Sequence, residues 1–162
     1  MKSTQYTLLK DDLIRLRSIS IDRSSFLLSL IDVGFISVFF YRCFRAWRLS
    51  ALNLTVLRAF LEKLVELFLK VHLPSGLDCG GGLVLIHGHG TIINSKARIG
   101  ENATIYHRVT VGVRFPGDQC PVLGNNVVLA SGCGVFGPVV LADNTIVKAN
   151  QILAPRNFDE SK

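Results

Sequence analysis

The sequence lacks a zinc-binding pattern. Its four cysteines, Cys43, Cys79, Cys120 and Cys133, form no Cys-x-x-Cys pair, and its four histidines supply no paired spacing that would complete a zinc site. We therefore expect no bound metal. Cysteines scattered without a disulfide framework are typical of a reducing compartment, so we also expect a cytoplasmic protein.

Long hydrophobic runs are also missing. The first apolar run, residues 26–41, spans 16 residues and contains Asp32, whereas a membrane-spanning helix needs about 20 apolar residues. No signal peptide is visible, because a charged lead precedes this run. The run indicates either a helix on the membrane surface or a helix in the core or at a subunit contact.

Acidic residues are absent from positions 33–61, within a segment 1–70 that carries eleven Lys/Arg and six Asp/Glu. A stretch of one charge sign beside aromatic side chains attracts anions. We therefore expect peripheral contact with the inner face of the cell membrane as one alternative. No nucleic-acid fold signature accompanies the charge, so we expect no nucleic-acid partner. The basic and aromatic side chains concerned are Arg42, Arg45, Arg48, Phe39, Phe40, Phe44 and Trp47.

The first 71 residues are expected to form a helical segment, with helices over residues 4–23, 24–50 and 54–71. In the last of these, apolar residues recur at helical spacing and predict a buried face, with Glu62, Lys63 and Glu66 opposite. Pro74 and Gly76 then end the helical pattern. Residues 72–162 are expected to form a second domain. The predicted buried positions are Leu57, Leu61, Leu64, Val65 and Phe68.

The second domain repeats with a period of six residues. The third residue of each hexad is aliphatic, and the residue four positions later is usually small. This pattern predicts a mainly β fold, in which short strands form triangular coils and one aliphatic side chain per hexad points inward. The aliphatic positions are Ile93, Ile99, Ile105, Val111, Leu123, Leu129, Val135, Leu141, Val147 and Leu153.

The repeat is interrupted twice. Leu85 and the next inward residue, Ile93, are eight positions apart instead of six, which inserts two residues around His87-Gly88-His89-Gly90. The segment 115–120, FPGDQC, has Gly117 where an aliphatic residue should stand, so we expect a loop that leaves the coil. Such interruptions are where we look for function.

The segment GGGLVLIHGHGTIINSKARIGENATIYHRVTVG resembles the serine acetyltransferase family and the related O-acetyltransferases of capsule and exopolysaccharide biosynthesis. The resemblance implies a left-handed parallel β-helix and acetyl-CoA as co-substrate. It also aligns His87 with the histidine that serves as the family's general base. Acyl transfer to a hydroxyl needs a base near neutral pH, and histidine titrates there. Backbone N–H groups of the glycine-rich coil edge would stabilise the oxyanion.

The remaining candidate residues also follow from the resemblance. His72 stands near the position where the serine enzymes carry an acid that orients the base, and Asp78 is a candidate substitute. His89 is a further candidate for the acceptor site. The family binds acetyl-CoA along coil-edge backbone. The corresponding positions here are Gly112, Val113, Ser131 and Gly132.

The acceptor site departs from the serine enzymes. Ile86 replaces the acid that precedes their catalytic histidine, and their loop sequence glycine-aspartate-arginine-histidine-proline reads here as Gly117-Asp118-Gln119-Cys120-Pro121. The candidate acceptor contacts in this loop are therefore Asp118, Gln119 and Cys120. They do not include the arginine that the loop of the serine enzymes carries. A zwitterionic acceptor should bind poorly to such a site.

We expect an acetyl-CoA-dependent O-acetyltransferase that acts on a sugar hydroxyl in surface polysaccharide biosynthesis. Serine O-acetyltransferase and a non-catalytic trimeric scaffold are the alternatives. The resemblance further implies a homotrimer in which the cofactor lies between neighbouring coils. A small molecule or a polysaccharide would be the acceptor.

Overall fold

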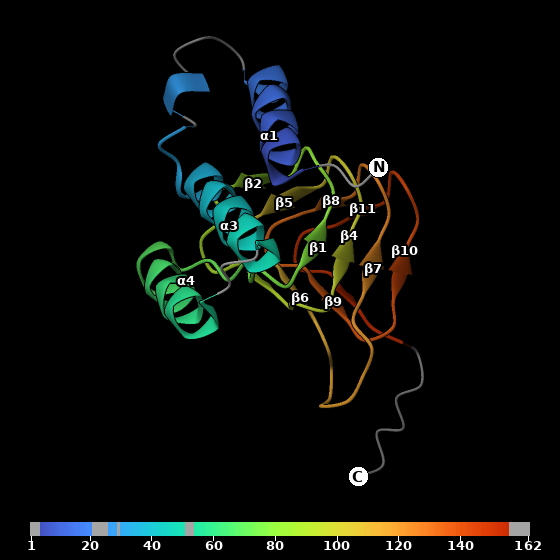
Figure 1. Cartoon of the computed structure of the whole chain (residues 1–162). Coiled ribbons are helices and arrows are strands. Elements are labelled where there is room, and N and C mark those ends of the chain that lie inside the picture. The colour runs from blue at the N-terminus through green and yellow to red at the C-terminus, as the bar shows by residue number, and fades with distance from the viewer. Residues whose placement is uncertain (1–3, 21–25, 29, 51–53, 156–162) are drawn as a thin grey trace.

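The computed structural model describes residues 4–20, 26–28, 30–50 and 54–155. Three helices, α1 (Gln5–Ile19), α3 (Val33–Leu49) and α4 (Thr55–Leu69), lie against one side of a coiled domain of short strands (Figure 1). The strands are β1 (Asp78–Cys79), β2 (Val84–Ile86), β3 (Ile92–Ile93), β4 (Arg98–Ile99), β5 (Thr104–Tyr106), β6 (Thr110–Gly112), β7 (Val122–Leu123), β8 (Val128–Leu129), β9 (Gly134–Phe136), β10 (Val140–Leu141), β11 (Ile146–Val147) and β12 (Ile152–Leu153).

The strands form three four-stranded parallel sheets, and each strand pairs with the strand three places further along the chain. Sheet 1 contains β1, β4, β7 and β10; sheet 2 contains β2, β5, β8 and β11; sheet 3 contains β3, β6, β9 and β12. This order is a parallel β-helix with a triangular cross-section, as the period of six predicts.

The inward positions of the repeat form the core. Nine of the ten predicted aliphatic residues are buried, and the tenth, Leu153 in the last coil, is partly buried against the same core. Small residues that turn the corners, such as Ala97, Ala103 and Cys133, are buried as well. The prediction of a hexad-based core is therefore confirmed.

Helix α3 is shorter than the expected helix over residues 24–50. It begins at Val33, and Asp32 stands at its N-cap, where the carboxylate accepts a hydrogen bond of 2.7 Å from the Gly34 N–H. Residues 26–28 are helical separately. The break follows from chemistry, because an aspartate competes for backbone donors and favours a helix start over a helix interior.

Helix α4 is turned toward the protein only partly as predicted: Leu61 and Val65 are half-buried, whereas Leu57, Leu64 and Phe68 are exposed. Its buried residue is Arg58, which bonds Ser75 Oγ on the coil and Glu62 on its own helix. His72 Nδ1, just beyond the helix, lies 2.9 Å from the Glu66 carboxylate. These polar contacts turn Glu62 and Glu66 partly inward, while Lys63 stays exposed. The remaining apolar residues point outward and form what we call the outward face of α4: Val56, Leu57, Phe60, Leu64, Leu67 and Phe68, all exposed.

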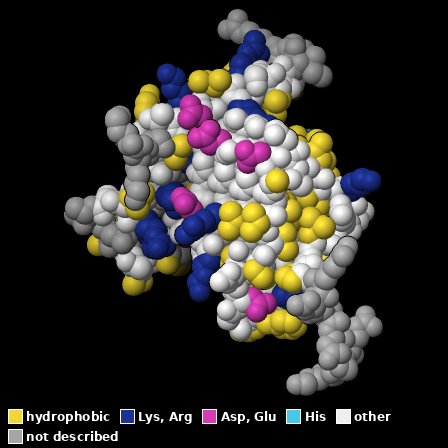
Figure 2. All heavy atoms as spheres, turned by 90° about the vertical axis from the view of Figure 1, so that its right-hand side faces the viewer, with side chains coloured by type: hydrophobic (Ala, Val, Ile, Leu, Met, Phe, Trp, Pro, Cys, Tyr) yellow, Lys and Arg dark blue, Asp and Glu magenta, His cyan; other side chains and the backbone are white. Residues whose placement is uncertain are grey.

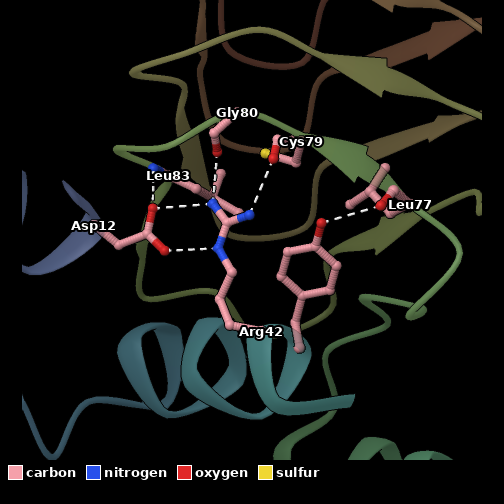
Figure 3. Close-up of polar contacts among 7 residues, drawn as sticks. Asp12, Arg42, Leu77, Cys79, Gly80 and Leu83 are labelled. Atoms are coloured by element: carbon pink, nitrogen blue, oxygen red, sulfur yellow. Dashed lines mark hydrogen bonds and ion pairs between the residues drawn. The ribbon is translucent and has the colours of Figure 1, made fainter. Parts of the chain in front are cut away.

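The basic residues of α3 do not form the anion-attracting surface that the sequence predicts. Arg42 is 1% exposed, and its guanidinium makes a bidentate pair with the equally buried Asp12 of α1, at 2.8 and 3.1 Å (Figure 3). The same guanidinium donates to the Cys79 and Gly80 carbonyls of the coil, and Asp12 accepts from the Leu83 N–H. One ion pair therefore joins both helices to the first coil.

Arg45 is also turned toward the coil. Its guanidinium lies 2.7 Å from the Asp78 carboxylate and donates to the Leu77 carbonyl. Tyr41, one turn earlier, is buried and donates to the same carbonyl at 3.1 Å. Of the three basic residues on α3, Arg48 alone is exposed. The membrane contact expected from this helix therefore loses its main electrostatic support.

Replacing Arg42 should destabilise the fold strongly. Arg42→Ala leaves the Asp12 carboxylate buried without its partner, which costs about 3–5 kcal/mol in the free energy of unfolding. Arg48→Ala, on the exposed side of the same helix, is the matched control and should cost under about 0.5 kcal/mol. Urea denaturation measures both. The double variant Asp12→Leu/Arg42→Met should recover much of the loss, and equal costs for Arg42→Ala and Arg48→Ala would contradict this account.

Candidate functional site

His87 lies at the corner between sheets 2 and 3, where the first coil carries its two additional residues. It follows β2 directly and adopts a left-handed backbone conformation with φ of +53°. Gly90, with φ of +73°, completes the turn, and its N–H donates to the Lys70 carbonyl at 2.8 Å. The His89 N–H donates to the His87 carbonyl at 2.6 Å. The longer corner therefore projects the His87 side chain outward.

The His87 ring is 76% exposed at this corner, so a substrate can reach it. Its Nδ1 atom lies 3.7 Å from Oδ2 of Asp32, the residue that caps α3. Catalytic hydrogen bonds are often long before substrate binds and tighten in the complex. At 3.7 Å the two groups are within ion-pair range but beyond hydrogen-bond distance. The carboxylate nearest to the candidate base thus comes from the helical segment.

A cavity of about 370 Å³ opens beside His87, between α1, α3 and β2. Its walls are mostly apolar, and its acidic lining residues are Asp12 and Asp32. Asp12 is already bound by Arg42 and by the Leu83 N–H. A ligand that enters this cavity from His87 therefore meets hydrocarbon and the Asp32 carboxylate. The apolar lining residues are Leu16, Ile19, Leu28, Phe35, Val38, Leu83, Val84, Leu85 and Ile86.

The predicted site residues fall at two different corners of the prism. Because Ile86 pairs with Tyr106 and Ile105 pairs with Leu129, the corner that begins at His87 continues through the coils to Ser131. His89 and Gly132 belong to this corner too. Gly112 ends β6, and Val113 and the loop 115–120 lead from it to β7, so these residues lie at the corner between sheets 3 and 1. A strand and its turns span about 15 Å at ~3.3 Å per residue, so one chain does not bring the two groups together.

Asp78 does not lie beside His87. It stands on β1 in sheet 1, where its carboxylate is paired with Arg45. The acid nearest to His87 among the described contacts is therefore Asp32, and not the one expected from the sequence. Asp32 was missed because its contact with His87 is long-range, although an acid interrupting an apolar run was a visible signal.

The loop 115–120 leaves the coil between β6 and β7, as predicted. The Asp118 carboxylate accepts from the Phe115 N–H at 3.0 Å, so it closes the loop on itself. Gln119 is exposed and Cys120 is half-buried. Burial raises the pKa of the Cys120 thiol, against a smaller opposing effect of Lys96. A raised pKa disfavours the thiolate, so the residue is a poor nucleophile.

The backbone at the candidate cofactor positions takes part in the hydrogen bonds between coils. A Cβ atom added at Gly112 would meet the Asn94 Cβ at 3.8 Å, but Gly112 is buried and its carbonyl accepts from the Gly137 N–H at 2.9 Å. The Gly132 N–H likewise donates to the His107 carbonyl, and the Ser131 carbonyl accepts from the Asn150 N–H. Both groups of positions therefore belong to the backbone ladder of the coil edge.

Within the ranges given above, no group of three or more His, Cys, Asp or Glu side chains is arranged to hold a metal ion. No helix in the described part of the chain has the length and apolar character needed to cross a membrane.

Comparisons with known proteins agree on one group. No protein-family model matches the chain. The serine acetyltransferase of Helicobacter pylori is 35% identical over 95 residues, which are 57% of this chain and 56% of that protein. The Staphylococcus xylosus enzyme is 32% identical over 100 residues, covering 60% and 46% respectively. The chain thus spans about half the length of the curated relatives it matches.

Solved structures extend the likeness to the helices. A crystal structure of Neisseria gonorrhoeae serine acetyltransferase superimposes with a TM-score of 0.81 at 21% identity, covering 93% of this chain and 61% of that one. At that identity the match establishes the fold. The expected left-handed parallel β-helix with an N-terminal helical segment is confirmed, and serine acetyltransferases are the proteins that this chain is similar to.

Proposed function

We propose that this chain is an acetyl-CoA-dependent O-acetyltransferase with His87 as its general base. The observation that carries the proposal is the His87 corner, where an exposed imidazole stands beside both a carboxylate and a cavity. The similarity to serine acetyltransferases supports the same chemistry. A non-catalytic scaffold would have no need of this arrangement.

The residues would act in two proton transfers. With Nδ1 directed to Asp32, the Nε2 atom of His87 removes the proton from the acceptor hydroxyl as its oxygen attacks the acetyl carbonyl carbon. When the intermediate collapses, the carbon–sulfur bond breaks and the His87 imidazolium returns the proton to the departing thiolate. The products are the acetyl ester and free CoA, so no net charge is left on the protein.

The acceptor that the comparisons support best is serine, which was the alternative reading of the sequence. A sugar hydroxyl in polysaccharide biosynthesis is the second candidate. It is favoured by Ile86, Gln119 and Cys120, which replace the charged groups of the serine enzymes, and by the apolar cavity. On this basis we propose that serine is accepted but bound weakly.

Removing the base should abolish most of the activity. His87→Ala should lower kcat by ~10²–10⁴-fold, the usual contribution of a general base. His87→Asn should do the same while tolerating the left-handed backbone better than alanine. CoA release under saturating substrates measures both, and His89→Ala is the control with a mild effect expected. Wild-type turnover in a folded His87→Asn protein would rule out the mechanism.

Restoring the loop cation should improve serine binding. Gln119→Arg adds a charge-assisted hydrogen bond for the acceptor carboxylate, which typically contributes about 1.5–3 kcal/mol. We expect the KM for L-serine to fall ~10-fold or more, measured by mass spectrometry of O-acetylserine, while the KM for acetyl-CoA stays unchanged. Gln119→Lys is a weaker, monodentate comparison. An enzyme that acetylates sugars and leaves serine untouched in every variant would favour the second acceptor.

We propose that the active protein is a homotrimer. The His87 corner and the loop corner are too far apart within one chain, and a neighbouring copy would bring its loop to the first chain's His87. Apolar side chains also gather on the coil side of the molecule (Figure 2), and exposed ones in sheet 1 include Val122 and Val140. Such surface is typical of a subunit contact.

The outward face of α4 would be covered by neighbouring copies in the same assembly. Its six large apolar side chains include Val56, which is 85% exposed, and Phe68, which is 75% exposed. Contact with an anionic membrane surface is the second candidate, because Lys63 and Lys70 are exposed on the same helix. A cytoplasmic location is proposed on the basis of the four free thiols.

A charge introduced on the outward face of α4 should show whether this face contacts neighbouring copies or a membrane. Phe60→Glu should reduce the trimer to smaller species in light scattering at micromolar concentration, because it buries a carboxylate in the contact. Tyr6→Glu, at an even more exposed aromatic on α1, is the control and should leave the trimer intact. A trimer that survives Phe60→Glu, together with flotation on anionic vesicles that Phe60→Glu abolishes, would assign this face to the membrane.

A further inference from the structure

We propose that Asp32 is the positioning residue for His87: one carboxylate oxygen caps helix α3 and the other holds the imidazole. The inference rests on the proposed function, because it assigns a partner to the proposed base. It differs from the sequence expectation in placing that partner on the helical segment. The helices would then complete the catalytic site as well as support it.

The two oxygens of Asp32 face different groups. Oδ1 accepts from the Gly34 N–H at 2.7 Å, which fixes the carboxylate at the first turn of α3. Oδ2 lies 3.7 Å from Nδ1 of His87. The cap restricts the carboxylate's rotation at the start of α3. The second oxygen is therefore presented to His87 as a fixed anion.

Gly34 brings this carboxylate to the coil. A Cβ atom at position 34 would lie 2.1 Å from the Leu85 carbonyl oxygen, so only glycine allows α3 to approach β2 this closely. Gly34 is itself buried, and Leu85 precedes His87 by two residues. The close approach of helix and strand thus sets the distance between Asp32 and His87.

The His87 ring needs such a partner. It stands on a left-handed residue at a corner and is largely exposed, so its neighbours restrict its rotamer little. A carboxylate on Nδ1 fixes the ring's orientation and favours the tautomer with the proton on Nδ1. The lone pair then resides on Nε2, the nitrogen that faces an incoming hydroxyl. Asp32 would act through His87 and make no contact with the reacting atoms.

The substitution Asp32→Asn removes the charge of the side chain and keeps its size. Asparagine caps helices about as well as aspartate, so α3 keeps its start while the anion is lost. We expect kcat to fall ~10–100-fold, the usual effect of removing a partner that orients a functional histidine, with the KM of the acceptor within about twofold. Asp32→Ala should lower kcat at least as much. Asp11→Asn, an exposed acid on α1, is the control with unchanged kcat.

The His87 tautomer supplies a readout that does not depend on turnover. Nitrogen-15 NMR of the full chain should show the proton on Nδ1 in the wild type and a shift toward the Nε2-protonated form in Asp32→Asn, with the circular dichroism unchanged. If no acceptor is ever acetylated, this shift still tests the Asp32–His87 contact separately from the proposed function.

Three results would overturn the proposal. A raised acceptor KM with unchanged kcat would mean that Asp32 binds an ammonium group of the acceptor. A lower kcat without any change in the His87 tautomer would reduce Asp32 to a structural cap. An unchanged tautomer together with unchanged kinetics would remove the contact from the mechanism altogether.

Discussion

The pair formed by Arg42 and Asp12 is the interaction on which the rest of the structure depends. Two charges are removed from water, and each is bound to backbone groups of the first coil as well as to its partner. A displaced helix would leave a buried charge without its hydrogen bonds, which is costly. The pair therefore selects one docking geometry for α1 and α3. The cavity and the position of Asp32 both follow from that geometry.

The coil was predictable because its information is local. Each hexad repeats the same environment, so Ile93, Ile105 and Leu129 can be assigned to the core from spacing alone. The helices offer no such repetition. Arg42 and Arg48 look equivalent in the sequence, yet one is buried and the other exposed, because the difference depends on Asp12 and on coil carbonyls distant in the chain. The rotation of α4 away from its predicted face has the same origin, since the buried Arg58 donates to Ser75.

The same distinction between local and long-range information applies to the candidate site. His87 was found because an insertion in a strict repeat is a local signal. Asp32 was not assigned, since its role depends on a helix start and on the room that Gly34 leaves above Leu85. Asp78 was the nearer acid in sequence, but Arg45 engages it. Sequence spacing identifies the candidate base, whereas the acid beside it is set by tertiary packing.

The same geometry bears on which acceptor is used. In the cavity Asp12 is saturated, so Asp32 is the carboxylate that an acceptor's ammonium group could meet. If Asp32 is engaged with His87, as we propose, pairing with an ammonium group would weaken its hold on the imidazole. The positioning of His87 and the binding of a zwitterion would then compete for one anion. A neutral hydroxyl acceptor avoids that competition. In the proposed trimer, serine would need its carboxylate matched by a neighbouring loop, where Gln119 and Cys120 carry no charge.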